Sequence, residues 1–403
     1  MIGLLGIALL LGIAWLMSTN RAAINWRTIG GAFALQASFG GLVLFFPPGK
    51  VALESVAFGV AAVLGYSREG ISFMFGPAVD ESFGFIFAFQ VLPVIVFFSA
   101  LVSVLYHMGI MTWVIRIMGG LLRWALGTSR PESLSAAANM LVGQAEAPLV
   151  ARPFIPGMTR SELFAIMVGG LASIAGSVMA GYAAIGIELK YLIAASFMAA
   201  PGGLLMAKMI IPETAEPKND LEELGEGDIM RSVNVFDAAA TGALSGMQIA
   251  LAVGAMLVAF IALIAMLNGM IGWAGGIFGY PELTLQLILG YLFQPLAWSI
   301  GVPWHEANQA GSFIGQKLVV NEFIAYFAFI EQKDSLTQGT QAIITFALCG
   351  FANFSSIAIL LGGLGSIAPS RRDDIARLGL RALLAATLAN LMSAALAGLF
   401  LSL

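Results

Sequence analysis

Residues 142–146 have the sequence VGQAE, and residues 319–322 have the sequence VVNE. Each stretch places a carboxylate close to an amide, inside a region too polar for a membrane span and too apolar for a loop in water, residues 131–157 and 305–332. Irregular backbone is tolerated at membrane depth only where protein or a water-filled cavity surrounds it. The sequence therefore predicts two opposed re-entrant hairpins.

The composition around these hairpins is that of a membrane protein. Of the 403 residues, 59% are hydrophobic and 10% are charged, against about 25% charged in an average soluble protein. A helix needs about 20 mostly apolar residues to cross the hydrocarbon core. Eight transmembrane helices are expected, at residues 2–17, 28–46, 83–108, 161–186, 190–211, 236–268, 341–365 and 381–402. The chain is predicted to be an all-α polytopic membrane protein.

Several classes of protein are disfavoured. The single cysteine, Cys349, allows no intramolecular disulfide, and two histidines form no cluster with metal-ligand spacing. The net charge is −4 and the basic residues are scattered, so no nucleic-acid footprint is present. Walker, nucleophile-elbow and His-Glu-x-x-His motifs are missing. We expect no enzyme and no cofactor, and any accumulation must be driven by an ion gradient.

The remaining segments and the basic residues predict a topology. The amphipathic stretches 51–64, 111–126 and 282–299 are expected to be interfacial helices, and residues 212–235, with the acidic run 220–228, a cytoplasmic linker. With the N-terminus outside, the inner side receives fourteen Lys and Arg residues. The outer side receives five: Lys50, Arg68, Lys190, Lys317 and Lys333. The positive-inside rule then predicts that both termini are outside.

The order of the elements occurs twice. A span, an amphipathic helix, a polar hairpin, a span broken by Gly and Ser, and another span follow one another in residues 83–211 and again in 236–403. Residues 1–82 precede the repeats with two spans and an interfacial helix. With three full spans in each unit, the second copy is inverted relative to the first.

The broken spans, 161–186 and 341–365, also match locally, since GLASI at 170–174 corresponds to GFANF at 350–354. Inverted repeats with broken helices are typical of secondary transporters, in which the broken elements supply free backbone groups to substrate and ion near the midplane. The sequence therefore predicts a transporter of a small polar solute.

Glu146 and Glu322, at the hairpin turns, are the first candidates for substrate contact. A carboxylate at the centre of a span costs about 2.5–3.5 kcal/mol, so it persists mainly where a partner or a wet cavity receives it. With the neighbouring amides of Gln144 and Asn321, they offer donors and acceptors suited to hydroxyls and ring nitrogens. The alternative is that the acids lie at an interface and bind loop amides.

Small polar residues follow the glycines of both broken spans, including Ser173, Ser177, Asn353 and Ser356. Such residues either unwind a helix and expose its carbonyls, or allow helices to pack closely. The matched positions favour a site.

Three stretches resemble the concentrative nucleoside transporters, and the resemblance covers nearly the whole chain. They are GQAEAPL at 143–149, NEF at 321–323 and CGFANFSS at 349–356. The resemblance implies a bacterial sodium-coupled nucleoside symporter of the inner membrane. It also implies a homotrimer in which each protomer holds a scaffold, including residues 1–82, and a moving transport domain.

The resemblance also implies roles for single residues. Four would face the nucleobase: Gly143, Gln144, Glu146 and Val178. Three would hold the ribose hydroxyls, Glu322, Asn353 and Ser356, and Phe351 would pack on the substrate. Sodium would bind the side chains of Asn139 and Ser173 and the carbonyls of Val142 and Ile174. Ala145 replaces the Thr or Ser common in relatives, so the preference between purine and pyrimidine stays open.

Other functions stay open from the residues alone. Within transport, the chain could be a proton-coupled nucleoside carrier or a carrier of another polar metabolite. An intramembrane enzyme would use Glu146 and Glu322 as an acid/base pair, and a purely structural membrane protein would leave these two costly acids unexplained.

Overall fold

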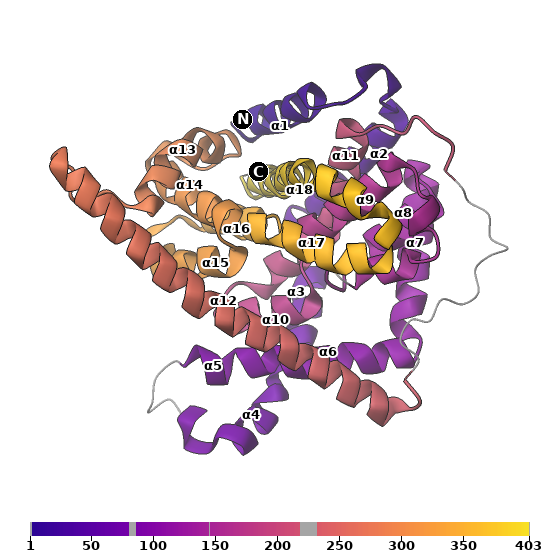
Figure 1. Cartoon of the computed structure of the whole chain (residues 1–403), viewed down its shortest axis with the longest axis horizontal. Coiled ribbons are helices and arrows are strands. Elements are labelled where there is room, and N and C mark those ends of the chain that lie inside the picture. Colours follow the sequence, from indigo (N-terminus) through magenta and orange to yellow (C-terminus); the bar gives the residue numbers. More distant parts are fainter. Residues whose placement is uncertain (1, 80–85, 145, 218–231, 403) are drawn as a thin grey trace.

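The described part of the chain consists of helices joined by short irregular segments (Figure 1). A computed structural model describes residues 2–79, 86–144, 146–217 and 232–402. The chain ends lie near each other, since α1 packs against α18. The prediction of an all-helical membrane protein is confirmed.

The first eleven helices, in chain order, are α1 (Ile2–Leu16), α2 (Trp26–Leu44), α3 (Pro47–Gly65), α4 (Ser67–Phe75), α5 (Phe87–Gln90), α6 (Leu92–His107), α7 (Ile110–Leu126), α8 (Arg130–Ala138), α9 (Arg160–Ala172), α10 (Gly176–Ala184) and α11 (Leu189–Ile210). The others are α12 (Val235–Ile277), α13 (Leu285–Ser299), α14 (Trp304–Val319), α15 (Glu322–Gln332), α16 (Gln338–Leu348), α17 (Phe354–Ile367) and α18 (Arg372–Leu401).

The number of candidate spans differs from the predicted eight. Within the described residues, six stretches are long and apolar enough to cross a membrane: 47–79, 87–107, 160–184, 189–210, 235–277 and 369–401. The bent pair α13 and α14, with an angle of 117°, would make a seventh. Two predicted spans fall short because α1 has only 15 residues and because the stretch 341–365 is interrupted between α16 and α17. The predicted span at 28–46 corresponds to helix α2, which is not among these candidate spans.

The three predicted interfacial helices have different outcomes. The helix α7 buries Met111, Ile115 and Leu122 on one face and exposes Arg116 and Arg123, as an amphipathic helix should. The stretch 51–64 lies in α3, which together with α4 is long enough to span, so its interfacial position stays a prediction. The stretch 282–299 contains α13, which joins α14 at the sharp bend. Most of the predicted linker, including its acidic run 220–228, lies outside the described residues.

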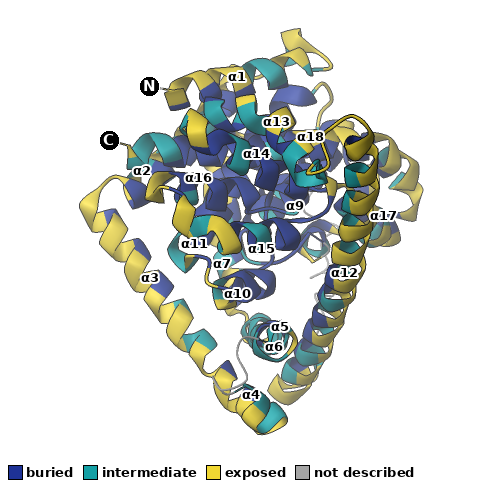
Figure 2. Cartoon of the chain, turned by 90° about the vertical axis from the view of Figure 1, so that its left-hand side faces the viewer, coloured by how far each residue is buried: buried dark blue, intermediate teal, exposed yellow. Residues whose placement is uncertain are grey.

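The candidate spans divide into a buried core and an exposed frame. In 160–184 and 189–210, 94% of the most apolar window is buried within the protein, whereas in 87–107 and 235–277 only 17% is. Figure 2 shows α3 with α4, and α12, as two largely exposed arms beside a buried core, with α5 and α6 between them at the narrow end. The apolar side chains of the frame therefore face lipid or another protein surface.

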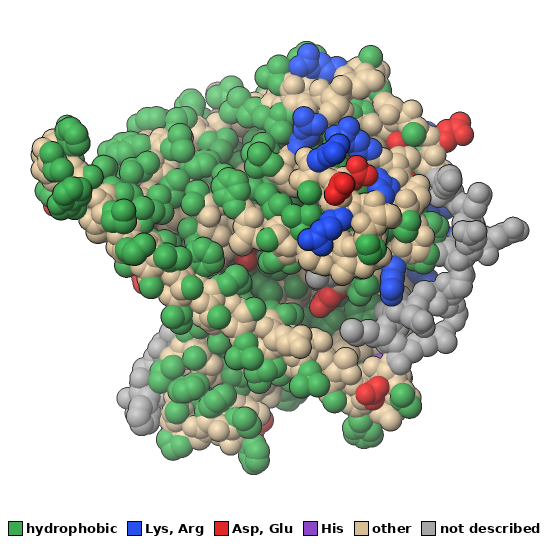
Figure 3. Space-filling model, viewed as in Figure 1, with side chains coloured by type: hydrophobic (Ala, Val, Ile, Leu, Met, Phe, Trp, Pro, Cys, Tyr) green, Lys and Arg blue, Asp and Glu red, His purple; other side chains and the backbone are tan. Residues whose placement is uncertain are grey.

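Basic side chains gather over one end of the molecule, while most of the same face is hydrophobic (Figure 3). This end includes the start of α18, which carries Arg372, Arg377 and Arg381. One of the five residues predicted to be on the outer side is misplaced. Lys317 is 3% exposed inside α14 and donates to groups of the core. It is therefore not a loop residue. Lys208, which was counted on the inner side, is also buried, at 6% exposed, so the predicted charge asymmetry rests on thirteen residues against four.

The frame helices α6 and α12 cross at glycines. A Cβ atom added to Gly246 would lie 2.8 Å from both the Cβ of Ser99 and the Cα of Val96, closer than side chains pack. Gly242 meets α6 in the same way at Ser103. The small residues let the two backbones approach closely, as in membrane helix pairs generally.

We predict that Gly246→Leu destabilises the protein, because a side chain at this crossing forces α6 and α12 apart. Overpacking of this kind costs about 1–3 kcal/mol, which a lowered melting temperature of the purified protein in detergent will report. Gly269→Leu is the matched control, since position 269 on the same helix faces open space. Equal melting temperatures for the two variants would contradict the close crossing.

Candidate functional site

The two hairpins are built differently. In the first, α8 is followed by an irregular turn and two short 3-10 helices, Ala147–Ala151 and Ile155–Gly157. In the second, α14 and α15 are regular helices separated by a break at Val320 and Asn321. Asn321 closes this break, because its side-chain oxygen accepts a hydrogen bond from the Ile324 amide at 2.9 Å. The side-chain oxygen of Asn321 thus caps α15, and the contact of Asn321 with the substrate stays a prediction.

Both broken helices are present, and their interruptions touch. The first break separates α9 from α10 at residues 173–175, and the second separates α16 from α17 at residues 349–353. The amide of Phe351 donates to the carbonyl of Ser173 across 3.1 Å. A Cβ atom on Gly350 would lie 2.7 Å from the carbonyl oxygen of Ala172, so only glycine permits this approach. The two breaks are thus joined by main-chain contact in the buried core.

Glu322 lies beside the second break, and each of its two carboxylate oxygens accepts a hydrogen bond from a side chain. Its side chain is 4% exposed. The Tyr182 hydroxyl donates to Oε1 at 3.0 Å, and the Asn353 amide donates to Oε2 at 2.8 Å. Asn353 in turn accepts from the Ser356 amide at 2.9 Å, which caps α17. The structure therefore brings together three of the residues predicted for the ribose.

Tyr182 is a site residue that the sequence analysis missed. It extends from α10, in the first broken helix, to the carboxylate of the second hairpin, and it is fully buried against Phe323 and Tyr326. A lone tyrosine in an apolar span gives no local pattern. The only signal was its place in the second half of a broken helix.

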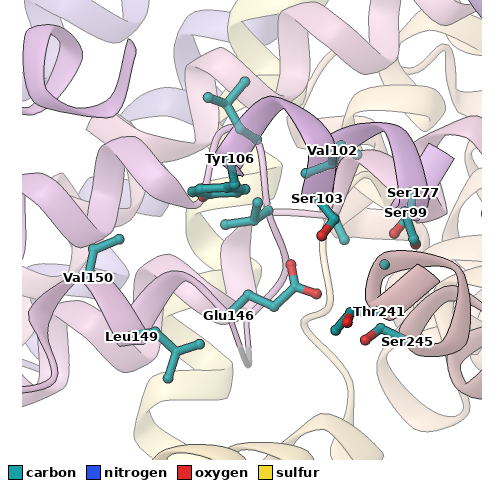
Figure 4. A pocket seen from close by; sticks show the side chains of 15 residues that line it. Ser99, Val102, Ser103, Tyr106, Glu146, Leu149, Val150, Ser177, Thr241 and Ser245 are labelled. Carbon is teal, nitrogen blue, oxygen red and sulfur yellow. The ribbon is translucent and has the colours of Figure 1, made fainter. Parts of the chain in front are cut away.

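Glu146 faces a cavity of about 160 Å³ between the first hairpin and the frame. The cavity is lined by hydroxyls of α6, α10 and α12: Ser99, Ser103, Tyr106, Ser177, Thr241 and Ser245. Figure 4 shows the Glu146 side chain reaching into this space beside Ser103, Thr241 and Ser245. Its Oε2 atom also accepts from the Gly143 amide at 3.3 Å. The hydroxyls of the frame were not among the predicted site residues, because the sequence does not say which helices cross.

The residues predicted to bind sodium also meet. Asn139 and Ser173 are 1% and 2% exposed, and the Ser173 hydroxyl lies 3.4 Å from the Asn139 oxygen. The Gly176 amide donates to the Leu141 carbonyl at 3.2 Å, which holds the hairpin turn against the first break. Among the described residues, no donor reaches the carbonyls of Val142 and Ile174. Free carbonyl and side-chain oxygens suit a hard cation, so this set fits sodium.

The predicted base and ribose residues do not line one cavity. Of the residues predicted to contact the substrate, only Glu146 belongs to the lining of its cavity over the described residues. The lining includes neither the other predicted base residues, Gly143, Gln144 and Val178, nor Glu322 and Asn353. Gln144 is 5% exposed with an unpaired Oε1 atom, and Val178 is buried on α10. The two groups are linked through α10, which carries Ser177 toward Glu146 and Tyr182 toward Glu322. Position 145 lies outside the described residues.

The chain matches models of known protein families along most of its length. The family model for the "Na+ dependent nucleoside transporter C-terminus" matches residues 191–398, more than half of the chain. The chain belongs to the Na+-dependent nucleoside transporter family. The model for the N-terminus of the same family matches residues 5–78, and one described as "Nucleoside recognition" matches residues 88–188. The family predicted from the sequence motifs is confirmed, and the protein is a transporter and not an enzyme.

Individual relatives agree along almost the full length. An uncharacterized transporter of Haemophilus influenzae is 59% identical over 99% of this chain and 97% of its own length. The nucleoside permease NupC of Helicobacter pylori is 48% identical over 99% of this chain and 97% of its own. The human sodium/nucleoside cotransporter 1 is 39% identical over 98% of this chain and 63% of its own.

Solved structures of CNTnw have the same fold. Its inward-facing, substrate-bound state is 56% identical in sequence, with a TM-score of 0.96 over 100% of this chain and 97% of CNTnw. A variant of CNTnw in an outward-facing state has a TM-score of 0.97 over 100% of this chain and 98% of that one.

We predict that Tyr182→Phe destabilises the protein, because it leaves the Oε1 atom of buried Glu322 without its donor. An unsatisfied buried acceptor costs about 1–3 kcal/mol, which thermal unfolding in detergent will measure. Tyr191→Phe is the control, since the Tyr191 hydroxyl has no hydrogen-bond partner among the described residues and the residue is partly exposed. Equal melting temperatures for Tyr182→Phe and Tyr191→Phe would contradict a stabilising hydrogen bond between Tyr182 and Glu322.

Proposed function

We propose that this chain carries nucleosides into the cell by sodium-coupled symport with alternating access. The observation that carries the proposal is the buried Glu322, held by Tyr182 from one broken helix and Asn353 from the other. A carboxylate with two oriented partners can accept hydrogen bonds from the hydroxyls of a ribose. The likeness of the fold to both inward-facing and outward-facing states of CNTnw supports the alternation.

The substrate would bind across the two clusters. Glu322, Asn353 and Ser356 would hold the ribose, and Phe351 would pack on the substrate. Glu146, Gln144, Gly143 and Val178 would face the base. Support for the second group comes from the cavity beside Glu146 and from the free oxygen of buried Gln144. Since the two clusters do not share one cavity in this conformation, closing of the hairpins around the substrate would complete the site.

Sodium would bind between the first hairpin and the first break, at Asn139, Val142, Ser173 and Ile174, where the oxygen donors lie together. With a neutral nucleoside and one sodium ion, one charge crosses per cycle. A potential of 100 mV then contributes about 2.3 kcal/mol, which corresponds to roughly 50-fold accumulation.

We further propose two inverted repeats and eight crossings, with α16 and α17 forming one broken span. Support comes from similar polar contacts between hairpin and broken helix in the two repeats. Glu132 in the first turn of α8 pairs with Lys208 at 2.7 Å, and Lys208 donates to Ser161 at the start of α9. Glu306 in the first turn of α14 accepts from Thr337 at the start of α16, at 3.0 Å. Each hairpin would thus be anchored to its own broken helix.

The assembly and orientation are proposals that rest on the family resemblance and on the charge asymmetry. The protein would be a homotrimer in the bacterial inner membrane with both termini outside. Residues 1–82 and α12 would belong to the scaffold, in agreement with the exposure of α3 and α12.

We predict that Glu322→Gln lowers kcat/KM for uridine and adenosine uptake at least 100-fold, because a carboxylate that accepts ribose hydroxyls is lost. The measurement is uptake into proteoliposomes with an imposed sodium gradient. Glu331→Gln, at the exposed end of the same helix, is the control and should transport normally. Unchanged uptake by Glu322→Gln would rule out the ribose assignment.

We predict that Ser173→Ala raises the sodium concentration for half-maximal uridine uptake about tenfold, because one oxygen ligand is removed. Uptake should vanish when choline replaces sodium. Ser366→Ala is the control, since that exposed hydroxyl bonds only to its own helix, at Gly363. A parallel loss in both variants, or uptake that persists in choline with a proton gradient, would exclude this sodium site.

A further inference from the structure

Lys317 is a buried cation at the second break. It lies near the end of α14 and is 3% exposed. Its ammonium donates to the carbonyl of Ala347 at 2.8 Å and to the side-chain oxygen of Asn390 at 2.7 Å. Taking an ammonium out of water costs several kcal/mol unless partners replace its hydration. The oxygens around Lys317 are therefore part of what keeps it in the core.

Asn390 connects this cation to both breaks. Its amide donates to the carbonyl of Ala172 at 2.6 Å and to that of Cys349 at 3.0 Å. Ala172 is the last residue of α9, and Cys349 follows the last residue of α16. Helix C-termini carry partial negative charge on their free carbonyls. The Lys317 ammonium and the Asn390 amide thus donate hydrogen bonds to carbonyl groups at the ends of α9 and α16.

The proposed sodium set has a corresponding place in the first half of the chain. Asn139 lies at the end of α8, the first helix of its hairpin, just as Lys317 lies near the end of α14. Both contact the end of the following broken helix, Asn139 at Ser173 and Lys317 at Ala347. In the first half the oxygens are left for an exchangeable cation, whereas in the second half a covalently attached cation lies among them.

The Lys317 ammonium and the Glu322 carboxylate stand on opposite sides of one helix break. Lys317 lies near the end of α14, and Glu322 is the first residue of α15; both side chains are buried. A fixed positive charge near this carboxylate compensates its negative charge without a bound ion.

We infer that Lys317 is a built-in cation that takes the place of a second coupling ion, so that only the first break exchanges sodium. The inference rests on the proposed function and makes Lys317 a positioning residue for Glu322. If the ammonium is removed and space is left, the carbonyl of Ala347 and the side-chain oxygen of Asn390 should recruit sodium, because they are oxygen ligands for a hard cation.

The test compares Lys317→Ser, which leaves room for an ion and adds a hydroxyl, with Lys317→Met, which fills the space without charge. Melting temperature is measured against sodium concentration at constant ionic strength, with choline as the replacement, and uridine binding is measured by calorimetry. Lys333→Ser is the matched control. It directly follows the same hairpin and also donates to a carbonyl, that of Gly186, but from a partly exposed position.

For Lys317→Ser, we expect the slope of melting temperature against the logarithm of sodium concentration to become about twice that of the unmodified protein, since two ions then stabilise the fold. Uridine affinity should fall at least tenfold at low sodium and recover at high sodium. Lys317→Met and Lys333→Ser should keep the one-ion slope, and Lys317→Met should bind uridine at least tenfold more weakly at all sodium concentrations.

A one-ion slope in Lys317→Ser, or a two-ion slope in Lys317→Met, would overturn the inference. So would a Lys317→Ser protein that unfolds in sodium and choline alike, because sodium should rescue it. If the unmodified protein shows no stabilisation by sodium and uridine, the proposed function itself fails, which is a separate result.

Discussion

Two helices interrupted in the middle of the protein leave main-chain carbonyls and amides that water cannot reach. Such groups must find partners inside the protein, because each unsatisfied one costs free energy comparable to a lost hydrogen bond. Here the partners are the other break, through Phe351 and Ser173, and the side chain of Asn390 on α18. The arrangement of the core around α18 follows from this requirement.

The same requirement explains why polar residues cluster where they do. Asn321 and Asn353 each use the side-chain oxygen to cap a half-helix, and Asn353 then has its amide left to orient Glu322. Capping and ligand binding are therefore not independent tasks in this protein. A residue that ends a helix at the right depth also points its second polar group into the space between the hairpins.

The sequence was sufficient to predict the helical membrane fold, the hairpins and the broken helices, because these depend on local polarity inside long apolar runs. The grouping of Glu322 with Asn353 was predicted from the resemblance to the family and not from polarity. The sequence did not predict Tyr182, Lys317 or Asn390. The importance of each arises only when another helix packs against it, which the sequence around the residue does not show. Lys317 was even assigned to a surface, because counting charges by segment assumes that a lysine between spans reaches water. The predicted number of spans, eight, also differs from the number of candidate spans in the structure, in part because residues 349–353 separate α16 from α17 and neither helix alone is long enough to cross.

The helix α12 runs unbroken for 43 residues and carries one charged residue, Asp237, near its start. At 1.5 Å per residue it is about 65 Å long, roughly twice the 30 Å thickness of the hydrocarbon layer. To keep its apolar side chains in lipid, the helix has to be strongly tilted away from the membrane normal. A transport domain that moves along this tilted helix would shift parallel to the membrane plane as well as across it. The path of the substrate through the membrane would then be oblique.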